Sequence, residues 1–246
     1  MEYLGIDIGG SGIKGAIVDV SSGQLLSERL RVVTPTPATP QAVAGKVADL
    51  VRQLNWRGKI GCGFPAVISH GVAQTAANID VSWIGTDVAA LLGEASGCPC
   101  VVLNDADAAG LAEMRFGCGR GRTGNVLLVT LGTGIGSALF HNGNLYPNVE
   151  LGHLRLKSGI AERYTSAAVR VNEALGWKPW SKRLNNFFVQ VERLLSPELI
   201  IVGGGVSRKY ERFFPYLETQ AELLPAELRN RAGIIGAACR AAEQQS

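Results

Sequence analysis

The sequence lacks the features that mark secreted, disulfide-stabilised or membrane-spanning proteins. It has five cysteines among 246 residues, and an odd, scattered set of this kind does not fit a disulfide framework. No apolar run approaches the roughly 20 residues that a membrane-spanning helix needs. The first residues also lack the basic and then apolar pattern of a secretion signal. We therefore expect a cytoplasmic protein with no membrane partner.

Charge is distributed unevenly along the chain. Residues 1–104 hold 7 basic and 8 acidic side chains, whereas residues 105–246 hold 17 and 13. Apolar residues make up 46% and charged residues 18%, which is the balance of a folded globular protein. A solvated surface is the ordinary explanation of the basic second half. A surface that handles a polyanion is the alternative.

Apolar periodicity and turn residues predict an alternation of strands and helices. The first half should contain strands at 3–8, 13–20, 25–33, 59–64 and 100–103, and helices at 40–54, 87–95 and 105–114. The second half should contain strands at 125–131, 135–140 and 199–202, with helices at about 162–175 and 184–195 and from 206. Thr39 could cap the first helix, and Pro40 suits its first position.

This order of elements repeats: a glycine-rich hairpin comes first, and helices and strands then alternate. The repeat predicts two α/β halves with a cleft between them. We place the halves at residues 1–108 and 109–246, and a C-terminal helix at 233–246 could pack back on the first half.

Three glycine-rich turns follow strands: DIGGSGIK (7–14), LGTGIG (131–136) and VGGGVS (202–207). Glycine allows backbone N–H groups to turn toward an anion, and phosphate is the usual occupant. One such turn is ordinary in a hairpin, but three are difficult to attribute to turn geometry alone. None is a Walker A loop or a Rossmann turn in its proper context.

Two further segments carry acidic or histidine side chains. Asp105 lies where a strand ends and a helix begins, so it could cap the helix or act as a general base. Glu150 and His153 are three residues apart, and Glu162 follows soon after. Such a set could hold a metal, move a proton or bind a polyhydroxylated substrate, and composition alone does not choose among these roles.

The order DIGG, NDAD, LGTGIG, ELGH and GGG resembles the ROK family of sugar kinases over essentially the whole chain. The resemblance implies an α/β fold of the actin-like ATPase type, with two ribonuclease-H-like halves. The segments TPTPATP, FPAVISHG, TAANIDVSWIGTD and SPELIIVGGGVS are similar to those of the polyphosphate-using glucokinases within that family. Those enzymes phosphorylate the 6-hydroxyl of glucose from inorganic polyphosphate, and many also accept ATP.

The resemblance also implies roles for individual residues. Asp105 would be the general base. The sugar would be bound by Asn104, Glu150, His153 and Glu162, with Asn78 as a further candidate. The phosphoryl chain would be bound by Gly9, Gly10, Ser11, Gly132, Thr133, Gly134 and Gly136, and Gly203, Gly204 and Gly205 would lie beside adenosine in nucleotide-using relatives. Asp7 would orient Mg²⁺ bound to the phosphates. Common members of the family carry Gly-Gly-Thr-Lys, whereas in this chain Gly12 stands at the lysine position. Lys14 lies two residues further along the same strand face and could still reach phosphate.

The chain departs from many relatives in one loop. They place a cysteine-rich zinc loop between the Glu-x-Gly-His segment and the next glutamate, whereas here LRLKSGIA alone separates His153 from Glu162. A structural zinc needs four nitrogen or sulfur ligands. We therefore expect no zinc, we interpret Glu150 and His153 as sugar ligands, and we expect another side chain to fix the imidazole.

Partners follow from the same resemblance: glucose, inorganic polyphosphate or ATP, and a second copy of the chain in a homodimer. Arg115, Arg120 and Arg122 could join Lys14 at the rim of a polyphosphate groove. A strictly ATP-dependent hexose kinase is the near alternative. A sugar-sensing regulator is disfavoured, because the chain begins with a strand and has no recognisable DNA-binding module, so we expect no nucleic-acid partner.

Overall fold

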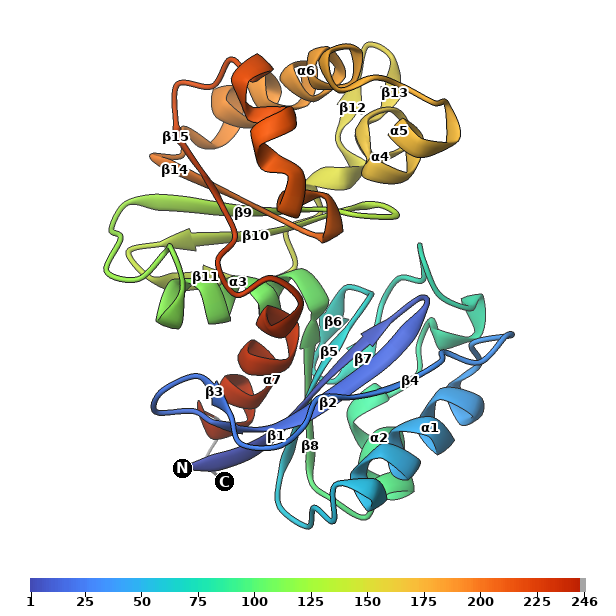
Figure 1. The fold of residues 1–246 in the computed structure, drawn as a ribbon. Coiled ribbons are helices and arrows are strands. Elements are labelled where there is room, and N and C mark those ends of the chain that lie inside the picture. Colours follow the sequence, from blue (N-terminus) through green and yellow to red (C-terminus); the bar gives the residue numbers. More distant parts are fainter. Residues whose placement is uncertain (244–246) are drawn as a thin grey trace. The chain divides into compact units, whose positions relative to one another are not determined.

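The structure is a computed structural model that describes residues 1–243. The chain forms two compact units (Figure 1). Among the described residues, unit 1 holds Met1–Ala112 and residues 231–243, and unit 2 holds Glu113–Asn230. The boundary therefore falls four residues after the position expected from the sequence, inside helix α3 (Asp105–Phe116).

The sheet of unit 1 begins with an antiparallel meander and continues with parallel strands. Its order is β3-β2-β1-β5-β8, and β4 also pairs with β2. The strands are β1 (Glu2–Gly9), β2 (Gly12–Asp19), β3 (Gln24–Leu25), β4 (Leu30–Val32), β5 (Ile60–Phe64) and β8 (Cys100–Asn104). Strands β1 and β2 are antiparallel, whereas β1, β5 and β8 run parallel.

The prediction of a single strand at 25–33 is wrong, because the chain forms two short strands there, β3 and β4. Between them, the Ser27 hydroxyl accepts a hydrogen bond from the Ile17 backbone N–H at 3.0 Å. A side chain thus takes the place that a backbone carbonyl would occupy in a continuous ladder, so the segment leaves the sheet and rejoins it at Leu30.

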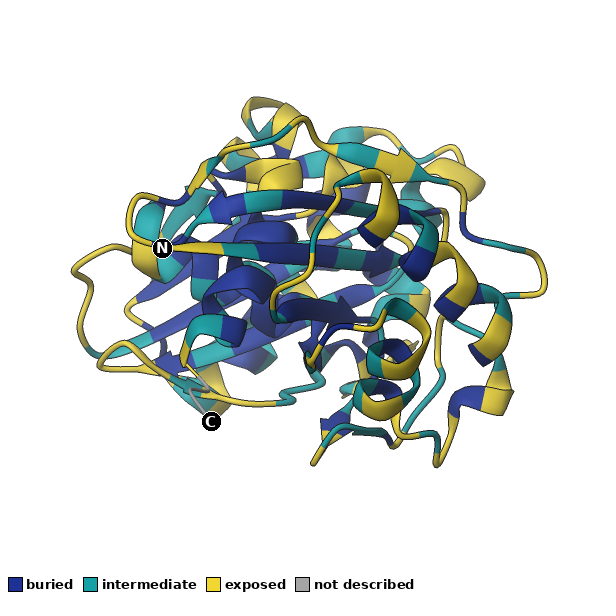
Figure 2. Cartoon of the chain, turned by 90° about the horizontal axis from the view of Figure 1, so that it is seen from below, coloured by how far each residue is buried: buried dark blue, intermediate teal, exposed yellow. Residues whose placement is uncertain are grey.

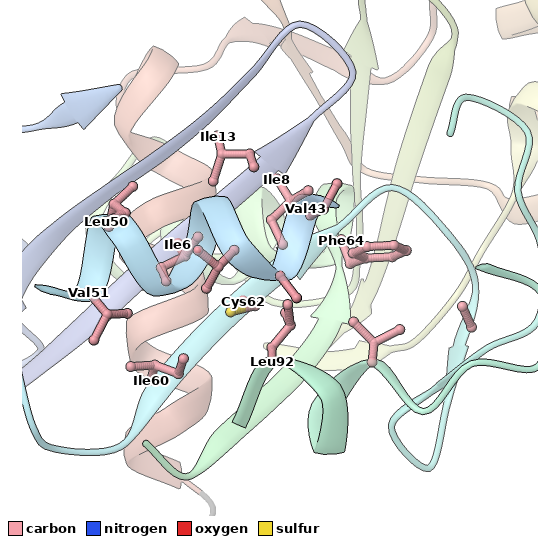
Figure 3. Packing of buried hydrophobic residues seen from close by; sticks show 14 of the residues in the cluster. Ile6, Ile8, Ile13, Val43, Leu50, Val51, Ile60, Cys62, Phe64 and Leu92 are labelled. Atoms are coloured by element: carbon pink, nitrogen blue, oxygen red, sulfur yellow. The ribbon is translucent and has the colours of Figure 1, made fainter. Parts of the chain in front are cut away.

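Alternation along β1 decides which helix covers which face of this sheet. Leu4, Ile6 and Ile8 are fully buried and point to one face. Helices α1 (Pro40–Gln53) and α2 (Val88–Ser96) cover that face, and Figure 3 shows the side chains between α1 and the strands. Pro40 occupies the first turn as expected, but the Thr39 side chain makes no cap hydrogen bond.

The opposite face of the same sheet is covered by α7 (Ala232–Glu243), dark red in Figure 1. Gly5 and Gly61 permit this approach, since a Cβ at either would overlap a backbone carbonyl oxygen of α7 (that of Ile234 or Ala237). Glycines on two neighbouring strands thus allow the backbone of the C-terminal helix to pack closely against the sheet. The described helix, Ala232–Glu243, begins one residue before the predicted 233–246, and residues 244–246 lie outside the described chain.

The sheet of unit 2 repeats the connectivity of the first. Its order is β11-β10-β9-β14-β15, with β9, β10 and β11 antiparallel and β9, β14 and β15 parallel. The strands are β9 (Asn125–Leu131), β10 (Ile135–His141), β11 (Asn144–Tyr146), β14 (Leu199–Gly203) and β15 (Glu222–Pro225). The internal repeat expected from the sequence is therefore present in the strand order of both units.

Two helix predictions in unit 2 need correction. The helix expected at 162–175 is two helices, α4 (Ala161–Thr165) and α5 (Ala167–Asn172). Ser166 separates them with extended backbone, and its hydroxyl caps α5 by accepting the Val169 N–H. Helix α6 (Trp177–Leu195) starts seven residues earlier than expected. Its buried Trp180 donates its indole N–H to the Thr165 carbonyl at 2.9 Å, a contact far away in sequence.

The remaining elements are short. They are β6 (Ile68–Ser69), β7 (Val72–Ala73), η1 (Val81–Trp83), η2 (Leu151–His153), β12 (Arg155–Leu156), β13 (Gly159–Ile160), η3 (Gly205–Arg212), η4 (Phe214–Tyr216) and η5 (Arg229–Arg231). The helix expected from residue 206 is the 3₁₀ element η3, with a kink at Lys209. Buried residues line the central strands, and exposed ones concentrate in the connections (Figure 2). Within residues 1–243, no helix combines the length and apolarity of a membrane span.

Candidate active site

The β1–β2 hairpin of unit 1 carries the first glycine-rich turn. Gly9 pairs with Gly12, and Asp7 lies directly opposite Lys14. The Lys14 ammonium is 2.9 Å from the Asp7 carboxylate, and the two side chains are only 25% and 20% exposed. The charge of Lys14, predicted to bind phosphate, is thus compensated within the hairpin by the carboxylate predicted to orient Mg²⁺.

A second cation lies over this turn. Arg31 is directly opposite Lys14 in the β2–β4 pairing, and its guanidinium donates to the Ser11 carbonyl at 2.9 Å. A Cβ at Gly12 would lie within about 3 Å of that guanidinium. Arg31 therefore fills the space that a side chain at Gly12 would need, and within residues 1–243 it has no carboxylate partner. Sequence reasoning missed Arg31, because the break between β3 and β4 shifts the pairing by two residues, and a continuous β2–β3 register would place Arg29 opposite Lys14.

Two other residues, Thr34 and Asn78, lie at the same turn. The Thr34 hydroxyl, buried, donates to the Gly9 carbonyl at 2.6 Å. The backbone carbonyl of Asn78 lies 3.5 Å from the position of a Cβ on Gly10. The structure thus brings Asn78, a predicted sugar-binding residue, beside Gly10 of the predicted phosphate turn.

Asn104 and Asp105 lie where β8 ends and α3 begins. The Asn104 side-chain oxygen accepts the backbone N–H groups of Ala106 and Asp107, at 2.8 and 3.1 Å. Its amide nitrogen donates to the Ala66 carbonyl at 3.1 Å. Asn104 therefore fixes the start of the helix, and Asp105 is the half-buried first residue of α3.

Sheet topology brings this carboxylate to the hairpin. Asp7 on β1 is opposite Gly63 on β5, and Gly63 is opposite Leu103 on β8. Because these strands are parallel, their carboxyl ends lie at one edge of the sheet. Asp7 and the start of α3 are two strand spacings apart, roughly 10 Å. The predicted base and the predicted phosphate turn thus share one sheet edge.

The other two glycine-rich turns meet at the corresponding edge of the unit 2 sheet. Thr130, at the end of β9, pairs with Gly203 at the end of parallel β14. Gly204 has φ +81°, and a Cβ there would collide with the backbone of Leu131. The turn at 132–136 begins immediately after Leu131, so the two predicted phosphate segments are adjacent.

Glu150, His153 and Glu162 gather in unit 2. Nε2 of His153 is 3.7 Å from the Glu162 carboxylate, and the Ile135 N–H donates to the other Glu162 oxygen at 3.4 Å. Burial raises the pKa of Glu150 above its ordinary value; the positive charge of His153 opposes this effect, and the Glu162 carboxylate adds to it. His153 is 43% exposed, so the cluster can reach a solvent-borne ligand.

Two side-chain contacts bear on the expected partner of the imidazole and on Arg122 of the predicted arginine rim. Among the described residues, no three His, Cys, Asp or Glu side chains are grouped as metal ligands. Glu162 is the side chain that approaches the imidazole. Arg122 makes a two-pronged ion pair with Glu222, at 2.7 and 2.9 Å, so its charge is compensated there.

Both α/β units have the same strand connectivity. Together with the similarity to the solved structures described below, this shows the actin-like ATPase fold. The sequence profile of the ROK family matches residues 3–168. The polyphosphate glucokinase of Mycobacterium tuberculosis (strain CDC 1551 / Oshkosh) is 48% identical over 236 residues, covering 96% of this chain and 89% of that protein. The polyphosphate glucokinase of Mycobacterium leprae (strain TN) is 46% identical, covering 96% and 73%. This chain belongs to the ROK family.

Solved structures give the same result. The inorganic polyphosphate/ATP-glucomannokinase from Arthrobacter sp. strain KM is 50% identical, with a TM-score of 0.96, covering 99% of each chain. A ROK family glucokinase from Streptomyces griseus, solved with glucose and AMPPNP, is 25% identical, with a TM-score of 0.85, covering 99% of this chain and 100% of that chain.

Proposed function

We propose that the protein phosphorylates the 6-hydroxyl of glucose with inorganic polyphosphate as donor, and that it also accepts ATP. The observation that carries the proposal is identity of 48–50% over nearly the whole chain to a polyphosphate glucokinase and to a polyphosphate/ATP-glucomannokinase. The local geometry supports it, because a half-buried carboxylate and a glycine-rich turn share one edge of the unit 1 sheet.

Asp105 is the proposed general base. As O6 of glucose attacks the terminal phosphorus, its proton passes to the Asp105 carboxylate. The bond between that phosphorus and the next bridging oxygen breaks, so the donor leaves one phosphoryl group shorter. A positioned base contributes about 10²–10⁴ in rate. Asn104 fixes the backbone of Asp105 by capping α3, while Asn78, Glu150, His153 and Glu162 bind the sugar.

The donor chain would be bound at the three glycine-rich turns, in which the predicted ligands are Gly9, Gly10, Ser11, Gly132, Thr133, Gly134, Gly136 and Gly203–Gly205. The Gly132 N–H already donates to the Gly134 carbonyl at 3.0 Å, so Gly132 shapes its turn rather than supplying a free donor. Mg²⁺ would neutralise the phosphate oxygens when bound, as in other phosphoryl transfers. The hairpin offers it a single carboxylate, Asp7, already paired with Lys14. That donor set fits a cation held mainly by phosphate and water.

Arg31 is the proposed cation of this donor site. Lys14 is compensated by Asp7, whereas Arg31 is exposed and directed over the turn. Replacing Arg31 with Ala should raise the KM for polyphosphate about tenfold and flatten its salt dependence, with little change in the KM for glucose. Arg57→Ala is the matched control, since this exposed arginine precedes β5 at the opposite sheet edge. Equal effects of the two substitutions would remove Arg31 from the donor site.

The deciding experiment measures glucose 6-phosphate formation with Mg²⁺, comparing polyphosphate and ATP at matched phosphoryl concentration. Faster turnover with polyphosphate supports the proposal. Turnover with ATP alone would favour the second candidate, a strictly ATP-dependent hexose kinase, and no turnover with either donor would refute both. The family resemblance also suggests a homodimer, which sedimentation at several protein concentrations tests.

A further inference from the structure

Ser137 has a buried side chain that hydrogen-bonds to the residues on either side of Glu150. It lies on β10 and is 2% exposed. Its hydroxyl donates to the Val149 carbonyl and accepts the Leu151 N–H at 3.0 Å. These two partners are the residues immediately before and after Glu150. One side chain of the sheet therefore fixes the backbone on both sides of the predicted sugar-binding carboxylate.

The start of β10 also contacts the segments that carry the other two sugar-binding residues. The Ile135 N–H donates to the Glu162 carboxylate. The Ile135 carbonyl lies against Gly152, where a Cβ would overlap it, and Gly152 is the neighbour of His153. Residues 135–137 thus touch all three segments, and every one of these contacts lies within unit 2.

The loop that carries Glu150 needs such external support. The element η2 has only three residues, and Glu150 precedes it without a side-chain cap hydrogen bond. Asn148, two residues earlier, has φ +60°, a conformation that non-glycine residues seldom adopt. A single 3₁₀ turn has too few hydrogen bonds to hold its own geometry. The hydrogen bonds to β10 therefore supply support that the short turn does not supply itself.

We infer that Ser137 is a positioning residue for sugar binding, acting through the backbone of Val149 and Leu151 to hold Glu150 and, through the same turn, His153. This inference rests on the proposed function. The glycine turn at 132–134 runs directly into the same strand, so the proposed phosphate turn and the proposed sugar loop are attached to one rigid hairpin.

The test compares two buried serines of unit 2. Ser137→Ala removes the hydroxyl without adding volume and leaves the Val149 carbonyl and the Leu151 N–H without that partner. Ser181 is equally buried, and its hydroxyl also makes two hydrogen bonds, to the Trp177 and Phe213 carbonyls. Those partners belong to α6 and to the end of η3, not to the sugar loop. Ser181→Ala therefore controls for the general cost of deleting a buried hydroxyl.

For Ser137→Ala we expect the KM for glucose to rise roughly tenfold, as loss of order in a binding loop would cause. The KM for polyphosphate should stay within about twofold of the wild-type value, since the glycine turns are unchanged. Ser181→Ala should lower the melting temperature by a similar amount and leave the KM for glucose unchanged. Glucose affinity from calorimetry should follow the KM, and Ser137→Thr should restore part of it by returning the hydroxyl.

Three results separate the possibilities. Equal KM values for glucose in Ser137→Ala and Ser181→Ala would show that Ser137 is merely structural. A parallel rise in the KM for glucose and polyphosphate would also overturn the inference, because the effect would not be local. Wild-type protein that neither binds nor phosphorylates glucose would refute the proposed function itself.

If Ser137→Ala is recovered unfolded, Ser137→Thr and Ser137→Cys supply the same comparison. Ser137→Cys should raise the KM for glucose more than Ser137→Thr does, and equal values would overturn the inference.

Discussion

Glu113 is a fully buried glutamate in the last part of α3, the first residue of unit 2. Its carboxylate accepts the Leu228 N–H at 2.7 Å and the Glu227 N–H at 3.2 Å. It also accepts the Cys118 N–H at 3.3 Å. Leu228 lies shortly before the chain leaves unit 2 at Asn230. Glu113 therefore joins, on the unit 2 side, the two segments through which the chain passes between the units.

Replacing Glu113 with Ala should destabilise the protein strongly. Three backbone N–H groups would lose their acceptor, and each unsatisfied buried donor costs about 1–3 kcal/mol. The sum would be roughly 3–9 kcal/mol, and water entering the space left by the side chain would restore part of it. We expect about 3 kcal/mol, which for a protein of this size lowers the melting temperature by roughly 6–12 °C.

The assay is thermal unfolding followed by circular dichroism, with urea unfolding as a second measure. Glu94→Ala is the matched control, because Glu94 is an exposed helical glutamate of α2, and it should change the melting temperature by about 1 °C at most. Glu113→Gln should fall between the two, since one oxygen acceptor remains. A melting temperature of Glu113→Ala within about 1 °C of wild type would refute this account of the buried carboxylate.

Three further predictions concern the proposed active site. Asp105→Asn should leave glucose affinity largely intact and reduce kcat by at least about two orders of magnitude, and wild-type turnover would remove Asp105 from the role of base. Glu150→Gln should melt at a higher temperature than wild type near about pH 7.5 and equally near about pH 4. Burial raises the pKa of Glu150, so the folded protein binds this proton more tightly and loses stability as pH rises through that pKa; a pH-independent difference would contradict this. Elemental analysis should find no stoichiometric zinc, and one tightly held zinc per chain would show that the shortened loop after His153 was misinterpreted.

Local signals predicted most elements but not their interruptions. Strand β9 was predicted to the residue, and β1, β2, β5, β8, β10 and β14 within a residue or two at each end. The break between β3 and β4 was missed because it depends on a hydrogen bond from Ile17 to Ser27. The early start of α6 was missed for a similar reason, because Trp180 binds the Thr165 carbonyl. Apolar periodicity within a segment does not reveal hydrogen bonds between distant residues.

The candidate site residues follow from local sequence: the glycine turns, the carboxylate at the start of α3 and the Glu150–His153–Glu162 set. Residue chemistry and local spacing suffice for that. Three contacts became known from the folded chain: Asp7 pairs with Lys14, Arg31 lies over the Gly9–Gly12 turn, and Ser137 binds the backbone on both sides of Glu150. Each of these contacts joins residues on different strands or loops, and strand register sets them. That register is established when the strands pair in the folded sheet, so local sequence patterns do not reveal it.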